Sequence, residues 1–209
     1  MELNASPDLS EQIANYTGLL PDFMIDHLVK EKELITHSTY VGAQVKTNAF
    51  GDSIPSKGLS STGYDVTLSG RFAVIKDPAH APLMPIDVRN FDSEFFVQVD
   101  AADKFILPAG TFALGVTNEY FNMPDDVTAV AVGKSTYARA GLQVIVTPIE
   151  AGFKGNVVIE MFNMTPHPIV IFPDAGISQF MFYKTPRPSV TYGDRSGKYQ
   201  GQQGITFPR

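Results

Sequence analysis

Short runs rich in Val, Ile, Phe and Tyr follow one another from about residue 39 onward, separated by Gly, Pro, Asn and Asp. Runs of this kind, bounded by turn residues, predict β-strands. The predicted strands cover residues 64–68, 72–75, 95–99, 112–116, 127–132, 142–146, 157–162, 169–172 and 179–183. Turn signals at this spacing favour an all-β fold, a barrel or jelly roll, over an α/β fold.

Three segments depart from the strand pattern. Residues 22–35 carry apolar side chains at helical intervals after Pro21, which predicts one amphipathic helix that packs on the barrel as a lid. Residues 134–139 lack alternation and predict a short helix or turn after Gly133. We therefore expect a single domain with an N-terminal helical segment (1–40), a β-barrel (41–191) and a C-terminal tail (192–209).

The composition fits one compact domain that shares an interface. The 209 residues are 44% hydrophobic and 18% charged, against about 25% charged in typical soluble domains. A buried subunit interface would account for the low charge. The net charge of -6 and a pI near 5.1 argue against a nucleic-acid partner, which normally requires a basic face.

The cysteine and histidine content argues against a zinc site. The chain has no cysteine, and its four histidines have no paired ligand spacing, so we expect no zinc site. The first residues lack the pattern of a secretory signal, and no apolar run approaches the roughly 18 residues needed to span a membrane. The prediction is a cytoplasmic protein with no membrane partner.

Glu160 is the strongest candidate for a catalytic residue. It stands between Ile159 and Met161 in a strand-like run. Apolar neighbours on both sides desolvate a carboxylate and raise its pKa into a range useful for proton transfer. The alternative is a buried glutamate held by a salt bridge.

Two further segments suit an anionic ligand. In residues 134–139 (KSTYAR), backbone N–H groups together with Lys134, Ser135 and Thr136 could grip phosphate, or the segment is an ordinary turn. The tail from Tyr192 is rich in Gly and Gln, a composition that suits either a segment ordered over a ligand or a frayed terminus.

The order of several motifs resembles the deoxycytidine triphosphate (dCTP) deaminase family. The motifs are GLSSTGYDVTL from Gly58, then GKSTYARAGL, VTP, GFKGNVVIEMFN and DRSGKYQGQQGITFP. The resemblance implies the distorted β-barrel of dUTPases, a homotrimer with active sites between subunits, and zinc-independent deamination of dCTP to dUTP and ammonia. It also implies Mg²⁺ bound through the nucleotide phosphates and makes dTTP a candidate inhibitor.

The resemblance assigns roles to individual residues. Glu160 matches the general base and acid, and Ser135 and Arg139 match the groups that position water and stabilise the ring. An interface ion pair is the alternative for Arg139. The matches for substrate binding are Lys134, Ser135, Thr136, Thr147, Glu150, Tyr192, Lys198 and Gln202. Among these, the backbone around Thr147 would read the cytosine edge, and Glu150 would contact the 3′-hydroxyl.

Two departures bear on a second activity. The commonest forms of the family have Arg at the position of Lys134, and Asp at the position of Glu150 orients the water for phosphate hydrolysis in dUTPases and bifunctional members. The extra methylene of Glu150 shifts its carboxylate, and about 1 Å of misplacement can cost about a hundredfold in rate. The departure at Glu150 therefore argues against an added dUTPase activity. The alternatives to a monofunctional deaminase are a bifunctional deaminase-dUTPase and a non-catalytic nucleotide sensor.

Overall fold

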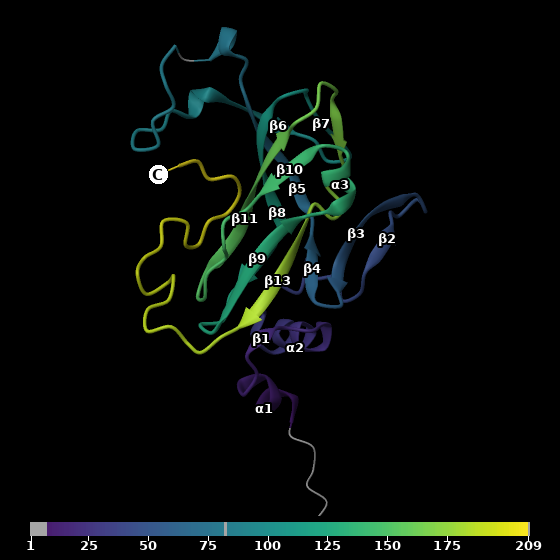
Figure 1. The fold of residues 1–209 in the computed structure, drawn as a ribbon, viewed down its shortest axis with the longest axis vertical. Coiled ribbons are helices and arrows are strands. Elements are labelled where there is room, and N and C mark those ends of the chain that lie inside the picture. The colour runs from purple at the N-terminus through teal and green to yellow at the C-terminus, as the bar shows by residue number, and fades with distance from the viewer. Residues whose placement is uncertain (1–7, 82, 209) are drawn as a thin grey trace, which may run out of the picture.

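The computed structural model describes residues 8–81 and 83–208. Two antiparallel sheets pack face to face around one apolar core, and the helices lie at the ends of the strands (Figure 1). The α-helices in the described ranges are α1 (Leu9–Ala14), α2 (Asp22–Lys32) and α3 (Ser135–Arg139). Two short 3₁₀ helices, Pro78–His80 and Ser93–Phe95, lie in the connection between β5 and β6.

The larger sheet follows the order β1-β13-β4-β3-β2, with β9 on the other edge of β13. Its strands are β1 (Gly18–Leu19), β2 (Val45–Thr47), β3 (Ser53–Ser60), β4 (Gly63–Val66), β9 (Val127–Gly133) and β13 (Ser178–Lys184). The second sheet has the order β10-β11-β8-β5-β6. It contains β5 (Leu68–Ile75), β6 (Phe96–Asp100), β8 (Phe112–Asn122), β10 (Leu142–Ile145) and β11 (Lys154–Asn163), and β7 (Phe105–Leu107) pairs with β12 (Ile169–Ile171) beside it.

Aromatic side chains from both sheets fill the core. Phe121 of β8 stacks on Phe180 of β13 at 5.2 Å between ring centroids, and Phe72 stacks on Phe105 at 4.0 Å. All four rings are buried. Offset ring pairs at these separations add stability beyond the area they bury.

The predicted helix over residues 22–35 is confirmed as α2, although it ends earlier. Glu33 adopts a left-handed conformation (φ 51°), and Ile35 forms a β-bridge with Phe121 instead of a further helical turn. The apolar face of α2 contributes Met24, Ile25, Leu28 and Val29 to the core. Within the described residues, no helix is long and apolar enough to cross a bilayer.

Strands are found at all the predicted places, and several run longer than expected. The predicted strand over residues 64–68 is divided between β4 and β5, and the one over residues 95–99 begins one residue later, after a 3₁₀ helix. β8 extends to Asn122 beyond the predicted end at residue 116, because its polar second half still pairs with β11. The sequence interpretation missed α1, β1, β2, β3 and β7. β3 contains Pro55 and Gly58 and shows little apolar alternation, which hides a strand in a sequence.

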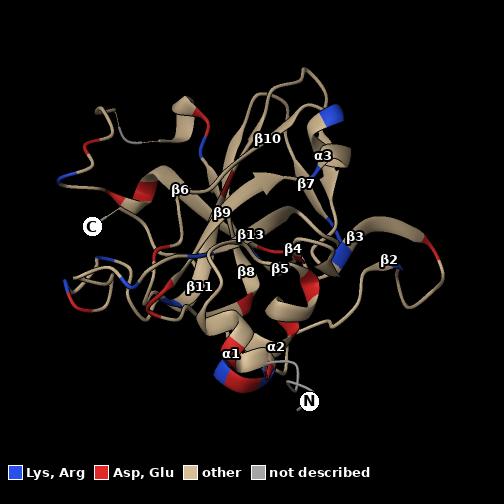
Figure 2. Ribbon diagram, turned by 60° about the horizontal axis from the view of Figure 1, so that its bottom comes forward, with Lys and Arg blue, Asp and Glu red and all other residues tan. Residues whose placement is uncertain are grey.

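Charge is sparse on the two sheets and concentrated elsewhere. Figure 2 shows acidic and basic residues over α1, α2 and the loops, whereas most of the ribbon of the sheets carries neither. Glu119 is a buried exception in β8, and it accepts hydrogen bonds from the backbone N and Oγ1 of Thr67 at 3.1 and 3.0 Å. Burial raises the pKa of Glu119 to about 7. This acid therefore ties β8 to the turn between β4 and β5.

Candidate active site

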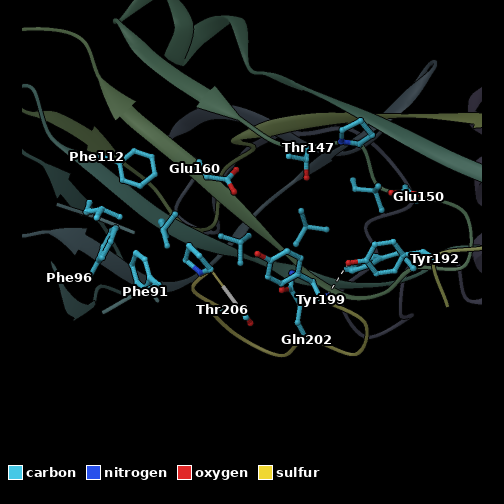
Figure 3. A pocket seen from close by; sticks show the side chains of 18 of the residues that line it. Phe91, Phe96, Phe112, Thr147, Glu150, Glu160, Tyr192, Tyr199, Gln202 and Thr206 are labelled. Atoms are coloured by element: carbon cyan, nitrogen blue, oxygen red, sulfur yellow. Dashed lines mark hydrogen bonds between the residues drawn. The ribbon is translucent and has the colours of Figure 1, made fainter. Parts of the chain in front are cut away.

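A cavity of about 770 Å³ lies over the outer face of the five-stranded sheet, beneath the C-terminal tail (Figure 3). Strands β5, β6, β8 and β11 form its floor, and the loop between β10 and β11 forms one wall. Its polar lining residues are Thr147, Glu150, Glu160, Tyr192, Tyr199, Gln202 and Thr206. Apolar side chains supply the rest of the lining.

Glu160 reaches this cavity because of the alternation along β11. Ile159 and Met161 point into the core, so the side chain between them points outward. On the neighbouring strands, Leu114 and Ile145 stand opposite Glu160. The carboxyl is half-buried, and burial raises its pKa above the ordinary value for Glu.

One carboxylate oxygen of Glu160 lacks a hydrogen-bond partner among the described residues. Oε2 is shielded from solvent and meets no donor. Among the described residues, Glu160 forms no salt bridge, in contrast to the alternative expectation of a buried glutamate held by one. A buried acceptor without a partner is costly, and such a group is a functional-site candidate.

The loop between β10 and β11 supplies Thr147 and Glu150 to the cavity. Ile149 pairs with Ala129 of β9 through two backbone hydrogen bonds, which fix the position of the loop. The Glu150 carboxylate accepts from the guanidinium of Arg195 in the tail. Glu150 therefore faces the cavity and also anchors the tail.

The tail is held along the cavity by several contacts. The hydroxyl of Tyr192 accepts from the backbone N of Tyr199 at 3.0 Å, and the amide of Gln202 donates to the carbonyl of Asn156. Near the end of the chain, Phe207 stacks on Phe91 at 5.4 Å. Of the three predicted tail residues, Tyr192 and Gln202 line the cavity, whereas Lys198 is exposed and lies outside the lining.

The predicted residues of α3 do not join this cavity within one chain. Ser135, Thr136 and Arg139 are exposed, and Thr136 lines a separate hollow of about 490 Å³ beside β12. In Figure 1, α3 and the tail lie on opposite sides of the barrel. A single chain therefore places the predicted ring- and phosphate-binding groups of α3 far from Glu160, whereas two of those in the tail line the same cavity.

Lys134 is engaged in the interior. Its Nζ donates to Asp65 Oδ2 at 2.7 Å and to Ser56 Oγ at 2.9 Å, and the Asp65 side chain is fully buried. The pair connects the start of α3 to β4 and β3. This contact differs from the predicted phosphate contact of Lys134 and gives Asp65 a structural role.

The sequence of this chain is similar to dCTP deaminases over most of its length. The sequence model described as dCTP deaminase-like matches residues 19–185. The dCTP deaminase of Campylobacter concisus is 42% identical over 193 residues, which cover 92% of this chain and 98% of that protein. The dCTP deaminase of Pelagibacter ubique is 40% identical over 193 residues, which cover 92% of this chain and 99% of that protein.

A solved structure shows the same fold. The 2′-deoxycytidine 5′-triphosphate deaminase from Agrobacterium tumefaciens superposes with a TM-score of 0.60 at 20% identity, over 80% of this chain. This chain spans about half of that one (48%). The predicted fold class is thereby confirmed, and the chain belongs to the dCTP deaminase-like family.

Sequence interpretation missed the apolar side of the cavity. Phe91, Phe96, Phe112 and Leu114 line it, but each reads in the sequence as an ordinary strand or loop residue. The pair of Glu150 and Arg195 was also missed, because its members lie 45 residues apart.

The contact between Lys134 and Asp65 predicts a loss of stability in K134M. Removal of the ammonium leaves the buried Asp65 carboxylate without its cation, which typically costs about 3–5 kcal/mol. Chemical denaturation would measure this loss, and the double variant K134M/D65N should recover part of it. An unchanged free energy of unfolding in K134M, together with a raised KM for the nucleotide, would assign Lys134 to the phosphates instead.

Proposed function

We propose that this protein catalyses the hydrolytic deamination of dCTP to dUTP and ammonia. The observation that carries the proposal is the Glu160 carboxyl, which faces a cavity, has a raised pKa and keeps one buried oxygen without a partner among the described residues. Membership of the dCTP deaminase-like family supports the choice of substrate.

Glu160 would serve as the proton shuttle. Deamination requires addition of water at C4 of cytosine, protonation of N3 and delivery of a proton to the departing amine. A single carboxyl can perform these steps in turn, since it accepts the proton of the water and later donates it. A pKa raised toward the working pH makes both directions of transfer accessible.

The remaining lining residues suit the polar parts of the nucleotide. The backbone around Thr147 would read the cytosine edge, and the Glu150 carboxylate would accept from the 3′-hydroxyl. Tyr192 and Gln202 from the tail, with Lys198, would bind phosphate oxygens. Closure of the tail would exclude water other than the nucleophile.

A second copy of the chain would complete the site. Ser135, Thr136 and Arg139 are exposed and far from the Glu160 cavity of their own chain, so they are available to a neighbour. Arg139 in particular offers fixed donors that stay charged, which suits stabilisation of the polarised ring. We infer a homotrimer with sites between subunits, and the exposed apolar face of β9, with Val130 42% and Val132 43% exposed, is consistent with an interface.

Mg²⁺ would bind to the site together with the nucleotide. Asp65 already binds Lys134 and Ser56, so we assign the ion to phosphate oxygens and water and not to this carboxylate. Bound there, Mg²⁺ would neutralise part of the triphosphate charge. We retain dTTP as a candidate inhibitor, since it carries the same sugar and triphosphate.

The first test is the separation of products after incubation of the protein with dCTP and Mg²⁺. We expect dUTP and ammonia. E160Q should lose turnover by several orders of magnitude and keep nucleotide affinity, because it removes the proton shuttle and preserves the shape of the side chain.

Three other results would change the assignment. Release of dUMP and diphosphate would show a bifunctional enzyme, although the contact of Glu150 with Arg195 does not favour a water-activating role. Tight binding of dCTP without turnover by the wild-type protein would indicate a nucleotide sensor. Equal loss of binding and turnover in E160Q would remove Glu160 from the proton-transfer role.

Mixing two inactive variants tests whether sites are shared between subunits. E160Q and R139A should each be inactive as homo-oligomers. Random mixed trimers should recover about one quarter of wild-type activity, since about one quarter of neighbouring pairs combine an intact Glu160 with an intact Arg139. Mixed trimers without recovered activity would contradict a site built from two chains.

A further inference from the structure

The cavity has two halves of different character on either side of Glu160. The polar half contains Thr147, Glu150 and the tail residues. The second half, here called the apolar half, is formed by Ile75, Phe91, Phe96, Phe112 and Leu114. Figure 3 shows Glu160 between Thr147 on one side and Phe112 on the other.

Sheet register brings the apolar half up to the Glu160 carboxyl. Leu114 of β8 stands directly opposite Glu160, and Phe112 follows two residues away on the same face. The next strands continue this surface, since Ile75 pairs with Phe96, whose ring lies 6.2 Å from that of Phe112. Apart from Phe91, which lies in the connection between β5 and β6, the apolar half therefore belongs to the sheet.

Unmodified dCTP has few apolar groups that could contact the apolar half. Its phosphates, sugar hydroxyl, N3, O2 and amino group are polar, and only the C5–C6 edge of the base is apolar. N3 and C5 flank C4 on opposite sides of the ring. If C4 lies at Glu160 and the N3 edge faces Thr147, the C5 edge points toward Phe112 and Leu114.

We propose that the apolar half receives a small alkyl substituent on C5 of cytosine, so that 5-methyl-dCTP is a substrate. This inference rests on the proposed deaminase function and extends its substrate class. Water adds at C4, the bond from C4 to the amino nitrogen breaks, and Glu160 delivers the proton to the leaving ammonia. The products of 5-methyl-dCTP are then dTTP and ammonia.

The tail limits the size of the substituent. Phe207 stacks on Phe91 and lies 5.3 Å from the ring of Phe96, so it covers the far end of the apolar half. The inference places a methyl group beside Phe112, whereas an aromatic substituent would have to displace Phe207. The site therefore selects small C5 groups.

The experiment compares dCTP with 5-methyl-dCTP on the full-length wild-type protein, with release of ammonia and dTTP as readouts. Burial of one methyl group lowers KM about fourfold relative to dCTP. Turnover of dCTP with at least tenfold lower kcat/KM for 5-methyl-dCTP would overturn the inference and leave the deaminase function intact. Turnover of neither nucleotide would overturn the deaminase function and the inference with it.

Variants of Phe112 test whether the C5 substituent binds in the apolar half. F112W fills the apolar half and should lower the ratio of kcat/KM for 5-methyl-dCTP to that for dCTP about tenfold, because a misfit of about one methylene group costs about this much. F112A enlarges the space and should admit 5-propynyl-dCTP. F50W is the matched control, because Phe50 is 90% exposed in the turn between β2 and β3. An equal ratio in F112W, F50W and wild type would place the methyl group elsewhere and refute the inference.

Discussion

The pairing of β11 with β8 and β10 is the constraint on which the site depends. This register places the Glu160 carboxyl on the outer face of the sheet, opposite Leu114 and Ile145, while Ile159 and Met161 fill the core. Because side chains alternate along a strand, a slip of one residue would bury the carboxyl in the core and expose apolar side chains. The energy of core packing therefore also fixes the position of the reactive group.

Asp65, Glu119 and Glu160 are acids of the two sheets that differ in their hydrogen-bonding partners. Asp65 is paired with Lys134, and Glu119 accepts hydrogen bonds from Thr67. Glu160 alone of these three has neither a cation nor a side-chain donor among the described residues. The first two acids connect strands, whereas the third is left available for a substrate. The same low-dielectric surroundings that make burial costly give Glu160 its raised pKa.

Much of the fold could be predicted because the strands that build the core alternate clearly and end at Gly, Pro, Asn or Asp. Strands such as β3, which have polar faces and an internal proline, carry too little apolar signal. Glu160 could be found for a local reason, since a lone carboxylate between Ile159 and Met161 stands out in a strand-like run. The side chains beside its carboxyl, such as Leu114 and Ile145, come from other strands, because Ile159 and Met161 face the core. Two features could not be found from the sequence: the contact of Lys134 with Asp65, and the apolar half of the cavity. Both bring together residues that are far apart in the chain. The distance between α3 and Glu160 within one chain likewise depends on the three-dimensional path of the strands.

The central claim is that burial holds the Glu160 carboxyl ready to exchange protons. The most direct test is the titration of this carboxyl by ¹³C NMR, with E160Q used to assign its signal. The account predicts a pKa clearly above the ordinary value of about 4.3 for Glu. Below that raised pKa the general base is protonated, so turnover should fall as pH decreases through the same value. A pKa at or below the ordinary value would contradict the account.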